Sequence, residues 1–514
     1  MAFDRKQRAL YRQFGSWRWI GFMFLVVVGG LLSQPLETQA QNCQYWVAPP
    51  PEGNDGFPGT FTQPWATLDY AAENVPDNNC TVWFKNGIYM GENVLSERFT
   101  TPTTFAAHQP YKAVLEHNGL VVSLNGILNM IFEGFEFRHS GVGPNPYVVK
   151  VDRADDQWSE NITFRNNIFH DSFNNDLLKI HNGVRFAIVE NNIFYNQGVN
   201  EQHMDVNSVT DVKIQDNIFF NDFAGSGRPV ANDTKHFIVI KDSNEDSDGL
   251  RGSERITVRR NIFLNWEGGF ETFLQVGNDG KPYHEAETVV VENNLLIGNS
   301  SSMNYAAFGV RGAKDITFAN NTIVGDFPSD KAFAFYVSIT EQNPENENIF
   351  FYNNIWSDPT GTMGSNLTSD PANNRFSLGD PEHTIDIKLD YNLYWNGSEE
   401  IPNGTPVSPL VDDPNRIVAN PLLNTNHDAV VLPRWDGTIF SSGNRTIRQE
   451  FIRLVEEYGK IEPNSPAIDQ ADPASAPTVD ILGHRRLTEP DLGAYEYDGQ
   501  EDGGAIYLPV VRKE

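Results

Sequence analysis

The stretch Ile162-Thr163-Phe164-Arg165-Asn166-Asn167-Ile168-Phe169 decides the fold, because versions of it recur down the middle of the chain. Its pattern is apolar-x-apolar-x-Asn-Asn-apolar-apolar. The alternation of apolar and polar residues before the Asn pair is typical of a strand with one buried face. Further copies begin at Ile188, Val212, Ile256, Val289, Ile316 and Ile349, with weaker ones at Met130 and Ile387.

The spacing of the copies predicts the architecture. The second Asn of the pair falls at positions 167, 192, 217, 261, 294, 321, 354 and 392, so a basal spacing of 25 residues is lengthened irregularly. Such a period is typical of a solenoid whose insertions form loops. Short strands without helical periodicity predict an all-β fold, a single right-handed parallel β-helix of about eight to ten coils stacked about 4.8 Å apart.

The Asn pair itself is interpreted as architecture. Asn tolerates the left-handed backbone conformation at a corner, and its amide can bond the equivalent Asn one coil along. We therefore expect a ladder of asparagines inside the coils and assign these residues no catalytic role.

Charge and the N-terminus bear on partners and location. The chain has 38 basic and 68 acidic residues, a net charge of −30, which argues against nucleic acid and anionic membranes as partners.

A basic segment precedes the apolar run Trp19 to Leu32, and Thr38-Gln39-Ala40 fits a cleavage site. Residues 1–40 are therefore predicted to be a signal peptide. The mature protein would be a secreted or cell-surface monomer without membrane insertion; an uncleaved membrane anchor is the alternative.

The chain contains two cysteines, Cys43 and Cys80, both outside the repeats. In an exported protein they would form one disulfide that ties the N-terminal cap. The alternative is a pair of free thiols.

Segments outside the repeats resemble known families. Pro64-Trp65-Ala66-Thr67-Leu68, the strand Val82 to Tyr89 and Thr104-Phe105 are similar to the start of secreted β-helix proteins related to pectate lyases, notably polysaccharide lyase family nine. Residues 69–74 would be a short helical cap over the open end. Asn420 to Leu423, Ser465 to Asp469 and Asp491 to Glu496 resemble the closing segment of β-helix proteins with a choice-of-anchor Q domain.

These boundaries divide the chain into regions. Residues 41–115 would form the N-terminal cap and first coils, 116–400 the β-helix repeats, 401–498 the C-terminal coils, and 499–514 a linker and tail. In proteins with such a closing segment the tail is thought to serve sorting or anchoring, which the resemblance implies here.

A second strand in each coil is predicted to place two columns of side chains on the outer surface. The first column is Lys150, Lys179, Asp205, Val239, Gln275, Gly309 and Tyr336; the second is Asp152, His181, Asn207, Lys241, Gly277, Arg311 and Ser338. His203 precedes the first column by two residues. Cations, histidines and carboxylates would thus share one patch.

Such a patch suits cleavage of an acidic polysaccharide by β-elimination, which needs a base and cations that stabilise an enolate-like intermediate. Crowded cations lower the pKa of a lysine and favour Lys241 as the base. Arg311, Lys179 and His203 would bind substrate or stabilise charge, and the expected substrate contacts are His181, Asn207, Gln275 and Tyr336. The alternative is a solvated charged face where Lys179 merely pairs with Asp205 across strands.

Two sets of residues suggest calcium. In lyase family nine a lysine is the base and aspartates hold calcium, and the resemblance implies that role for Asp205, with Asp176 nearby. Asn244-x-Asp246-x-Asp248-Gly249, with Glu254 beyond, also follows a calcium-loop spacing. Glu254 falls five residues after the glycine, one short of the usual position, so a merely acidic loop is the alternative.

The leading hypothesis is therefore a calcium-assisted polysaccharide lyase acting on an extracellular uronate polymer. A non-catalytic glycan-binding or structural surface protein is second, and a glycoside hydrolase is third. An enzyme should show a groove over the two columns, and a structural protein should show every charge there paired.

Overall fold

A computed structural model describes residues 43–499 except 144–146, 174, 199–200, 229–233, 365–373, 380, 403 and 405–412. The predicted signal peptide and the tail after Gly499 lie outside the described residues. No helix within the described ranges is long and apolar enough to cross a membrane.

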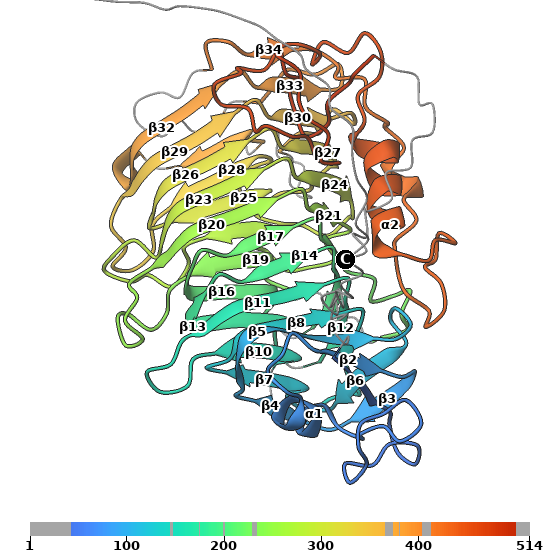
Figure 1. The fold of residues 1–514 in the computed structure, drawn as a ribbon. Helices are drawn as coiled ribbons and strands as arrows, with labels where there is room; N and C mark the ends of the chain where they lie inside the picture. The colour runs from blue at the N-terminus through green and yellow to red at the C-terminus, as the bar shows by residue number, and fades with distance from the viewer. Residues whose placement is uncertain are drawn as a thin grey trace, which may run out of the picture. The chain divides into compact units, whose positions relative to one another are not determined.

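The described protein is all-β, and the named strands pair in parallel, each with its counterpart one coil along. They form three ladders (Figure 1). The first consists of β4 (Asn93–Leu95), β7 (Val122–Asn125), β10 (Val149–Asp152), β13 (Leu178–Arg185), β16 (Gln202–Thr210), β19 (His236–Lys241), β22 (Leu274–Val276), β25 (Phe308–Arg311), β28 (Phe335–Ser338) and β31 (Ser377–Gly379).

The second ladder is continuous with the first in one sheet, because β13 and β16 belong to both. It consists of β1 (Gln44–Val47), β2 (Thr81–Phe84), β5 (Arg98–Ala107), β8 (Leu128–Glu133), β11 (Ser159–Arg165), β14 (Ile188–Glu190), β17 (Lys213–Gln215), β20 (Ser253–Arg259), β23 (Ala286–Glu292), β26 (Ala313–Ala319), β29 (Asn346–Tyr352) and β32 (Thr384–Asp390).

The third ladder is a separate sheet. It consists of β3 (Gly87–Met90), β6 (Ala113–His117), β9 (Glu136–His139), β12 (Ile168–Ser172), β15 (Ile193–Gln197), β18 (Ile218–Phe220), β21 (Ile262–Leu264), β24 (Leu295–Asn299), β27 (Thr322–Asp326), β30 (Ile355–Asp358), β33 (Leu393–Asn396) and β34 (Ile417–Val418). Parallel strands stacked coil on coil are the arrangement that the repeat predicted.

The Asn pair forms the corner between the second and third ladders, and its two members have different roles. The first residue adopts a left-handed backbone, as at Asn166, where φ is 56°. The second is fully buried, and the predicted asparagine ladder is confirmed. Its amides bond from coil to coil along Asn167, Asn192, Asn217, Asn261, Asn294, Asn321, Asn354 and Asn392.

The two apolar residues that end the repeat point to opposite sides of the third ladder. Phe169 stacks in the core with its counterparts at centroid distances of 4.7–4.8 Å, whereas Ile168 packs outside with the C-terminal segment. That segment contains the helix α2 (Ile447–Leu454), which continues as a π-helix, η4 (Val455–Gly459), and lies along the third ladder (Figure 1). Short 3₁₀ turns are η2 (Pro381–His383) and η3 (His427–Ala429).

The N-terminal end carries α1 (Leu68–Asn74), a short helix as predicted. Thr67 caps the helix by accepting the Tyr70 N–H, and the Asp69 carboxylate accepts the backbone N–H of Val94 in β4. Cys43 and Cys80 form a disulfide in this region.

Candidate functional site

The two predicted columns exist in the first ladder with the expected register. Lys150 pairs with Lys179, Lys179 with Asp205, and the column continues one coil at a time to Tyr336. In the second column His181 pairs with Asn207, which pairs with Lys241.

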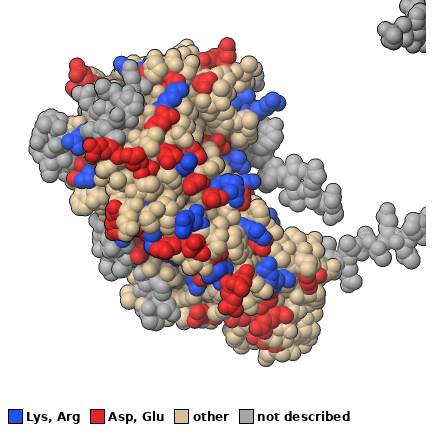
Figure 2. All heavy atoms as spheres, turned by 90° about the vertical axis from the view of Figure 1, so that its left-hand side faces the viewer, with Lys and Arg blue, Asp and Glu red and all other residues tan. Residues whose placement is uncertain are grey.

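Most side chains of the two columns are buried or half-buried, whereas side chains on an open surface would be exposed. Asp205, Asn207 and Gln275 are at most 2% exposed. The side chains of the four basic candidates keep 13–14% exposure; they are Lys179, His181, Lys241 and Arg311. Acidic and basic side chains are interleaved on the side of the molecule that Figure 2 shows.

Lys179 is the centre of a charge cluster on the first ladder. Its Nζ lies 2.5 Å from Asp205 Oδ2 and 3.8 Å from Asp176 Oδ2, and 5.4 Å from the ring centroid of Tyr147. Burial opposes every charge here, but the pairing holds the pKa of Asp205 below and that of Lys179 above its ordinary value. Burial, which Lys179 only partly offsets, raises the pKa of Asp176 to about 8.

His181 lies two residues after Lys179 on β13, so the two side chains share a face. Burial, assisted by the charge of Lys179 and opposed by that of Asp152, lowers the pKa of His181 to about 4. The imidazole is therefore neutral at pH 7. Its Nε2 lies 3.3 Å from Asp152 Oδ2, and its ring centroid is 6.4 Å from that of Tyr147.

Three buried atoms in this cluster lack a hydrogen-bond partner among the described residues: Asp176 Oδ2, Asp205 Oδ1 and His181 Nε2. Buried polar atoms are satisfied in most proteins, so three orphans around one lysine call for an explanation. We call Tyr147, Asp176, Lys179, His181 and Asp205 the Lys179 cluster.

Lys241 does not have the property expected of a base. Burial alone would lower its pKa, but the carboxylates of Asp205 and Asp279 outweigh burial and hold the pKa above its ordinary value. Its Nζ lies 3.2 Å from Asp279 Oδ1. This direction is the opposite of the one expected from crowded cations, because Asp205 of the first column and Asp279 of a loop outside the columns both favour the protonated lysine.

The remaining members of the columns make local contacts. Arg311 lies 3.7 Å from Glu271 and 5.6 Å from the Tyr336 ring centroid. Asn207 donates to the Ser243 hydroxyl. Gln275 is buried and donates to the Gly277 carbonyl, so as a substrate contact it would first have to break that bond.

The prediction that His203 belongs to the surface patch is wrong. His203 is completely buried, with its ring centroid 4.8 Å from that of Phe237, and its Nε2 is 3.0 Å from Asn221 Oδ1. Its counterparts in the other coils are the buried residues Leu177, Phe237 and Phe273. Those apolar residues were the signal that this is a core position.

Burial lowers the pKa of His203 to about 3. The pKa of His203 in the folded protein is below the unfolded value of 6.5. The neutral histidine therefore contributes fully to stability above pH 6.5, and this contribution is lost as the pH falls toward 3. Between pH 7.5 and pH 5, we expect the unfolding free energy of the wild type to fall by about 2 kcal/mol more than that of His203→Phe. Urea midpoints at the two pH values measure this.

The control is His484→Gln, because the His484 side chain is 56% exposed. This control removes an exposed histidine and should leave the urea midpoint at pH 7.5 close to that of the wild type. An equal pH dependence for wild type and His203→Phe would show that His203 does not titrate on unfolding in this range.

The residues expected to bind calcium have other partners in the described structure. Around Asp205 and Asp176 the Lys179 ammonium already occupies the position of a cation. In the 244–254 loop, the Asn244 amide N–H and the Ser208 hydroxyl both donate to Asp248. The described residues include no group of three or more His, Cys, Asp or Glu side chains arranged to hold a metal ion.

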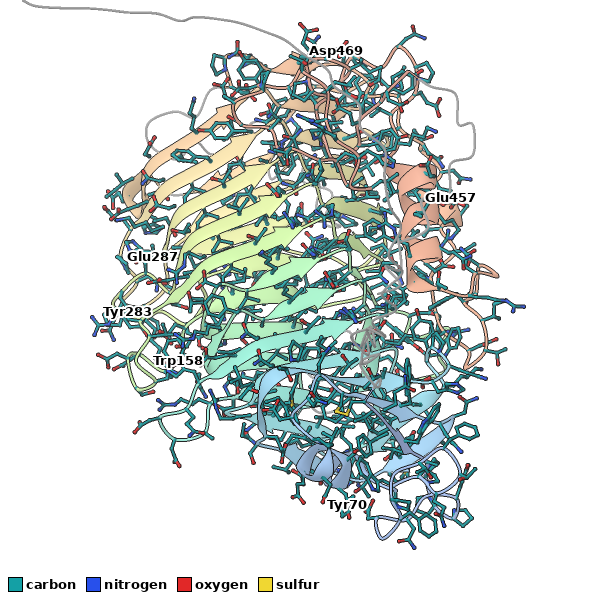
Figure 3. The ribbon with its side chains drawn as sticks, viewed as in Figure 1. Tyr70, Trp158, Tyr283, Glu287, Glu457 and Asp469 are labelled. Carbon is teal, nitrogen blue, oxygen red and sulfur yellow. A yellow bond between two sulfur atoms is a disulfide. The ribbon has the colours of Figure 1, made fainter. Side chains whose placement is uncertain are left out.

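The other expected ligands of that loop are turned to different partners. Asp246 is exposed and lies 3.5 Å from Arg251, and Glu254 lies 2.6 Å from Arg255. Arg251 is in turn over the ring of Tyr283, which Figure 3 labels on the same side of the molecule as Trp158. The spacing of acidic residues thus corresponds here to an acidic, ion-paired loop.

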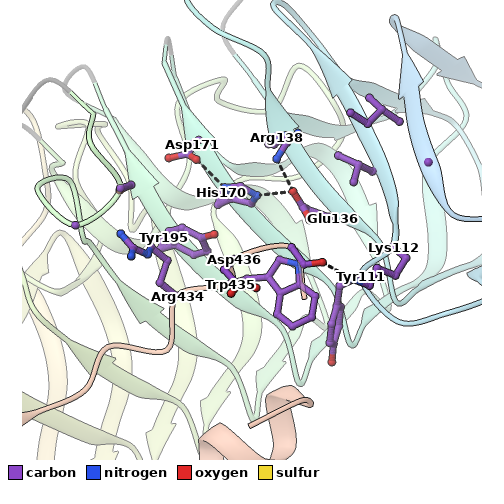
Figure 4. A pocket seen from close by; sticks show the side chains of 16 residues that line it. Tyr111, Lys112, Glu136, Arg138, His170, Asp171, Tyr195, Arg434, Trp435 and Asp436 are labelled. Carbon is purple, nitrogen blue, oxygen red and sulfur yellow. Dashed lines mark hydrogen bonds and ion pairs between the residues drawn. The ribbon is translucent and has the colours of Figure 1, made fainter. Parts of the chain in front are cut away.

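A second site was not anticipated from the sequence. A cavity of about 570 Å³, here called the third-ladder cavity, lies between the third ladder and the loop 434–437 (Figure 4). His170 lies on its floor, with Nδ1 2.8 Å from Asp171 and Nε2 3.1 Å from Glu136. Although burial opposes protonation, these two carboxylates raise the pKa of His170 to about 9.

Comparison with known proteins defines no family. No family model matches the chain, and no curated protein matches it. Similar solved structures include pectate lyase Pel9A, at 14% identity over 88% of this chain and 96% of that one, with a TM-score of 0.48. XylC in complex with xylose has 12% identity over 88% and 98%, with a TM-score of 0.43.

A surface adhesin is among the similar structures as well. PfbA of Streptococcus pneumoniae has 12% identity over 59% of this chain and 90% of that one, with a TM-score of 0.38. Scores this low carry no argument about function. The fold and site described above therefore define the protein only as an all-β chain of stacked parallel strands with a buried charge cluster on one ladder.

Proposed function

We propose that the chain is an exported, monomeric, right-handed parallel β-helix protein that cleaves an acidic extracellular polysaccharide by β-elimination at the Lys179 cluster. The observation that supports this most is the set of unpartnered atoms Asp176 Oδ2, Asp205 Oδ1 and His181 Nε2 around a protonated lysine. Unused hydrogen-bonding capacity beside the partly exposed side chains of Lys179 and His181 suits a site for a hydroxyl-rich substrate.

The proposed reaction uses groups in the protonation states that their surroundings favour. The neutral His181 takes the proton from the carbon beside the uronate carboxylate, and the nearby Asp152 stabilises the imidazolium that forms. The Lys179 ammonium stabilises the enolate-like intermediate. The C–O bond of the leaving sugar then breaks and a C=C bond forms.

The leaving oxygen needs a proton, and Tyr147 can donate it. Burial is the largest of the influences that raise the pKa of the Tyr147 phenol, so the phenol keeps its proton at neutral pH. In this scheme Lys241 and Arg311 remain charged and bind the anionic chain. No step is assigned to calcium, because Lys179 supplies the positive charge.

The test is incubation of the purified mature chain with pectate, alginate and glycosaminoglycans, each with added calcium and with a chelator. A rise in ultraviolet absorbance from the unsaturated product is expected with one of the polymers. The rate should be equal with calcium and with chelator. No rise with any uronate polymer would refute the elimination, and a rise abolished by chelator would refute the role given to Lys179.

A second candidate is a non-catalytic glycan-binding or structural surface protein. The observation that favours it is the pairing of the basic residues of the columns, since each has a carboxylate within 4.0 Å. The pairs are Lys150–Asp152, Lys179–Asp205, His181–Asp152, Lys241–Asp279 and Arg311–Glu271. Binding of a polymer without release of any unsaturated product would select this candidate.

A further inference from the structure

The third-ladder cavity has the size of a ligand site. Its volume of about 570 Å³ lies within the usual range for small-molecule sites, about 300–1,000 Å³. One side is the outer surface of β6, β9, β12 and β15, and the other is the loop 434–437, which returns to it from far along the chain (Figure 4).

The loop is fixed in place by contacts on both sides of the cavity. Lys112 donates to the Gly437 carbonyl, Arg434 lies 3.4 Å from Asp222, and the backbone N–H of Ile447 donates to the Tyr111 hydroxyl at 3.3 Å. The cavity is therefore formed before any ligand arrives, which lowers the entropic cost of binding.

The floor is polar and its charges are fixed. Arg138 lies 2.8 Å from Glu136, which also contacts His170. Burial alone would raise the pKa of Glu136, but His170, Arg138 and the nearby indole of Trp435 hold it below its ordinary value. Carboxylates held in place in this way can accept hydrogen bonds from hydroxyl groups of a ligand, and the cations can donate hydrogen bonds to them.

The wall is aromatic. Trp435, Tyr111 and Tyr195 line the cavity and are 7%, 3% and 2% exposed. The indole N–H of Trp435 is buried and has no partner in hydrogen-bonding geometry among the described residues, although the ring lies near Glu136. An aromatic wall opposite a polar floor suits a sugar ring, which has apolar C–H faces and hydroxyl edges.

One cation in the lining has no ion-pair partner within 4.0 Å among the described residues, although its charge acts on the nearby carboxylate of Asp436. Arg138, His170 and Arg434 each have a carboxylate partner. Lys112 has no carboxylate within 4.0 Å in the described part of the chain, and its Nζ lies 5.6 Å from the Trp435 ring centroid. Lys112 is thus available to a carboxylate on the ligand.

We propose that the third-ladder cavity binds a carboxylated sugar unit, with its ring against Trp435, its hydroxyls on Glu136 and Arg138, and its carboxylate on Lys112. The site is separate from the Lys179 cluster, and its occupation does not depend on elimination there. The shared chemistry fits either a free uronic acid or the end of a uronate chain.

The test is calorimetric titration of the mature chain with D-galacturonate, D-glucuronate, a galacturonate trimer and D-glucose. Saturable binding of a uronate is expected, with glucose at least about tenfold weaker. Binding of the monomer would identify a free acid as sufficient, and binding of the trimer alone would identify a chain end. Lys112→Met should weaken uronate binding about tenfold, and Trp435→Phe should weaken it as well.

The matched control is Lys213→Met, since Lys213 is an exposed lysine on β17 outside the cavity. Its affinity should equal that of the wild type, and thermal melting verifies that each variant is folded. The titrations are repeated in His181→Gln, which should bind uronate normally even though the proposed elimination is lost. Absence of saturable uronate binding, equal affinity for glucose, or unchanged binding by Lys112→Met would each overturn the assignment.

Discussion

Replacing His181 by glutamine is expected to lower the rate of elimination about 100- to 10,000-fold, the range that a general base contributes. Glutamine is polar and of similar length, but it cannot take up a proton at neutral pH. The Lys179–Asp205 pair is left intact by the change. The measurement is the initial rate of unsaturated-product formation on the polymer that the wild type cleaves.

The pH dependence of the elimination rate tests the role of His181 independently. Because the pKa of His181 is lowered to about 4, the imidazole stays neutral above that pH. On the acidic side of neutrality, activity should therefore fall only as the pH drops toward 4. His484→Gln serves again as the control and should retain full activity. A rate for His181→Gln within about twofold of the wild type would exclude His181 as the base and return the role to another group.

The second large effect is expected on stability. Asn294 donates to the Val258 carbonyl and to Asn321 Oδ1, and its own oxygen accepts two N–H groups of Asn261. Asn294→Ala removes all four bonds. Asn321 Oδ1 still accepts the backbone N–H of residue 294, and Asn261 Nδ2 still donates to the Ile214 carbonyl. The Asn261 backbone N–H and the Val258 carbonyl lose their side-chain partner, at about 1–3 kcal/mol each. We expect a loss of about 3–5 kcal/mol in unfolding free energy.

The measurement is the urea midpoint followed by circular dichroism. Asn86→Ala is the matched control, because Asn86 is exposed and bonds only to the Gln109 side chain among the described residues. The control should remain within about 0.5 kcal/mol of the wild type. A similarly small effect for Asn294→Ala would mean that the asparagine ladder contributes little to the stability of the coils.

Much of the architecture was predictable because it repeats. Each coil pairs with its neighbours, so a residue such as Asn217 has the same environment as Asn192 and Asn261 on either side. Period-two alternation then assigns the outward positions, and the register of Lys179 with Asp205 follows from aligning the coils. Because the coils repeat, a local sequence pattern predicts contacts between residues that are far apart in the sequence.

The candidate site was predictable only in part, because the behaviour of a charge depends on all its neighbours. The columns placed Lys241 correctly but could not supply Asp279, which comes from a connecting loop and keeps the lysine protonated. The alternation along the strand predicts that His203 faces outward. In the structure it packs against Phe237 and is buried in the aromatic core. Burial and charge pairing are decided by side chains from several segments at once.

The sequence by itself determined the parallel coils, the buried asparagine ladder and the two columns, since these follow from a short repeat and the geometry of a strand. Only the tertiary structure decided the protonation of the Lys179 cluster and the existence of the third-ladder cavity. The cavity forms because the non-repeating loop 434–437 returns to β6 and β9, bringing Trp435 beside Glu136 and Lys112 beside Gly437. A contact between segments so distant, one of them outside the repeat, leaves no periodic trace in the sequence.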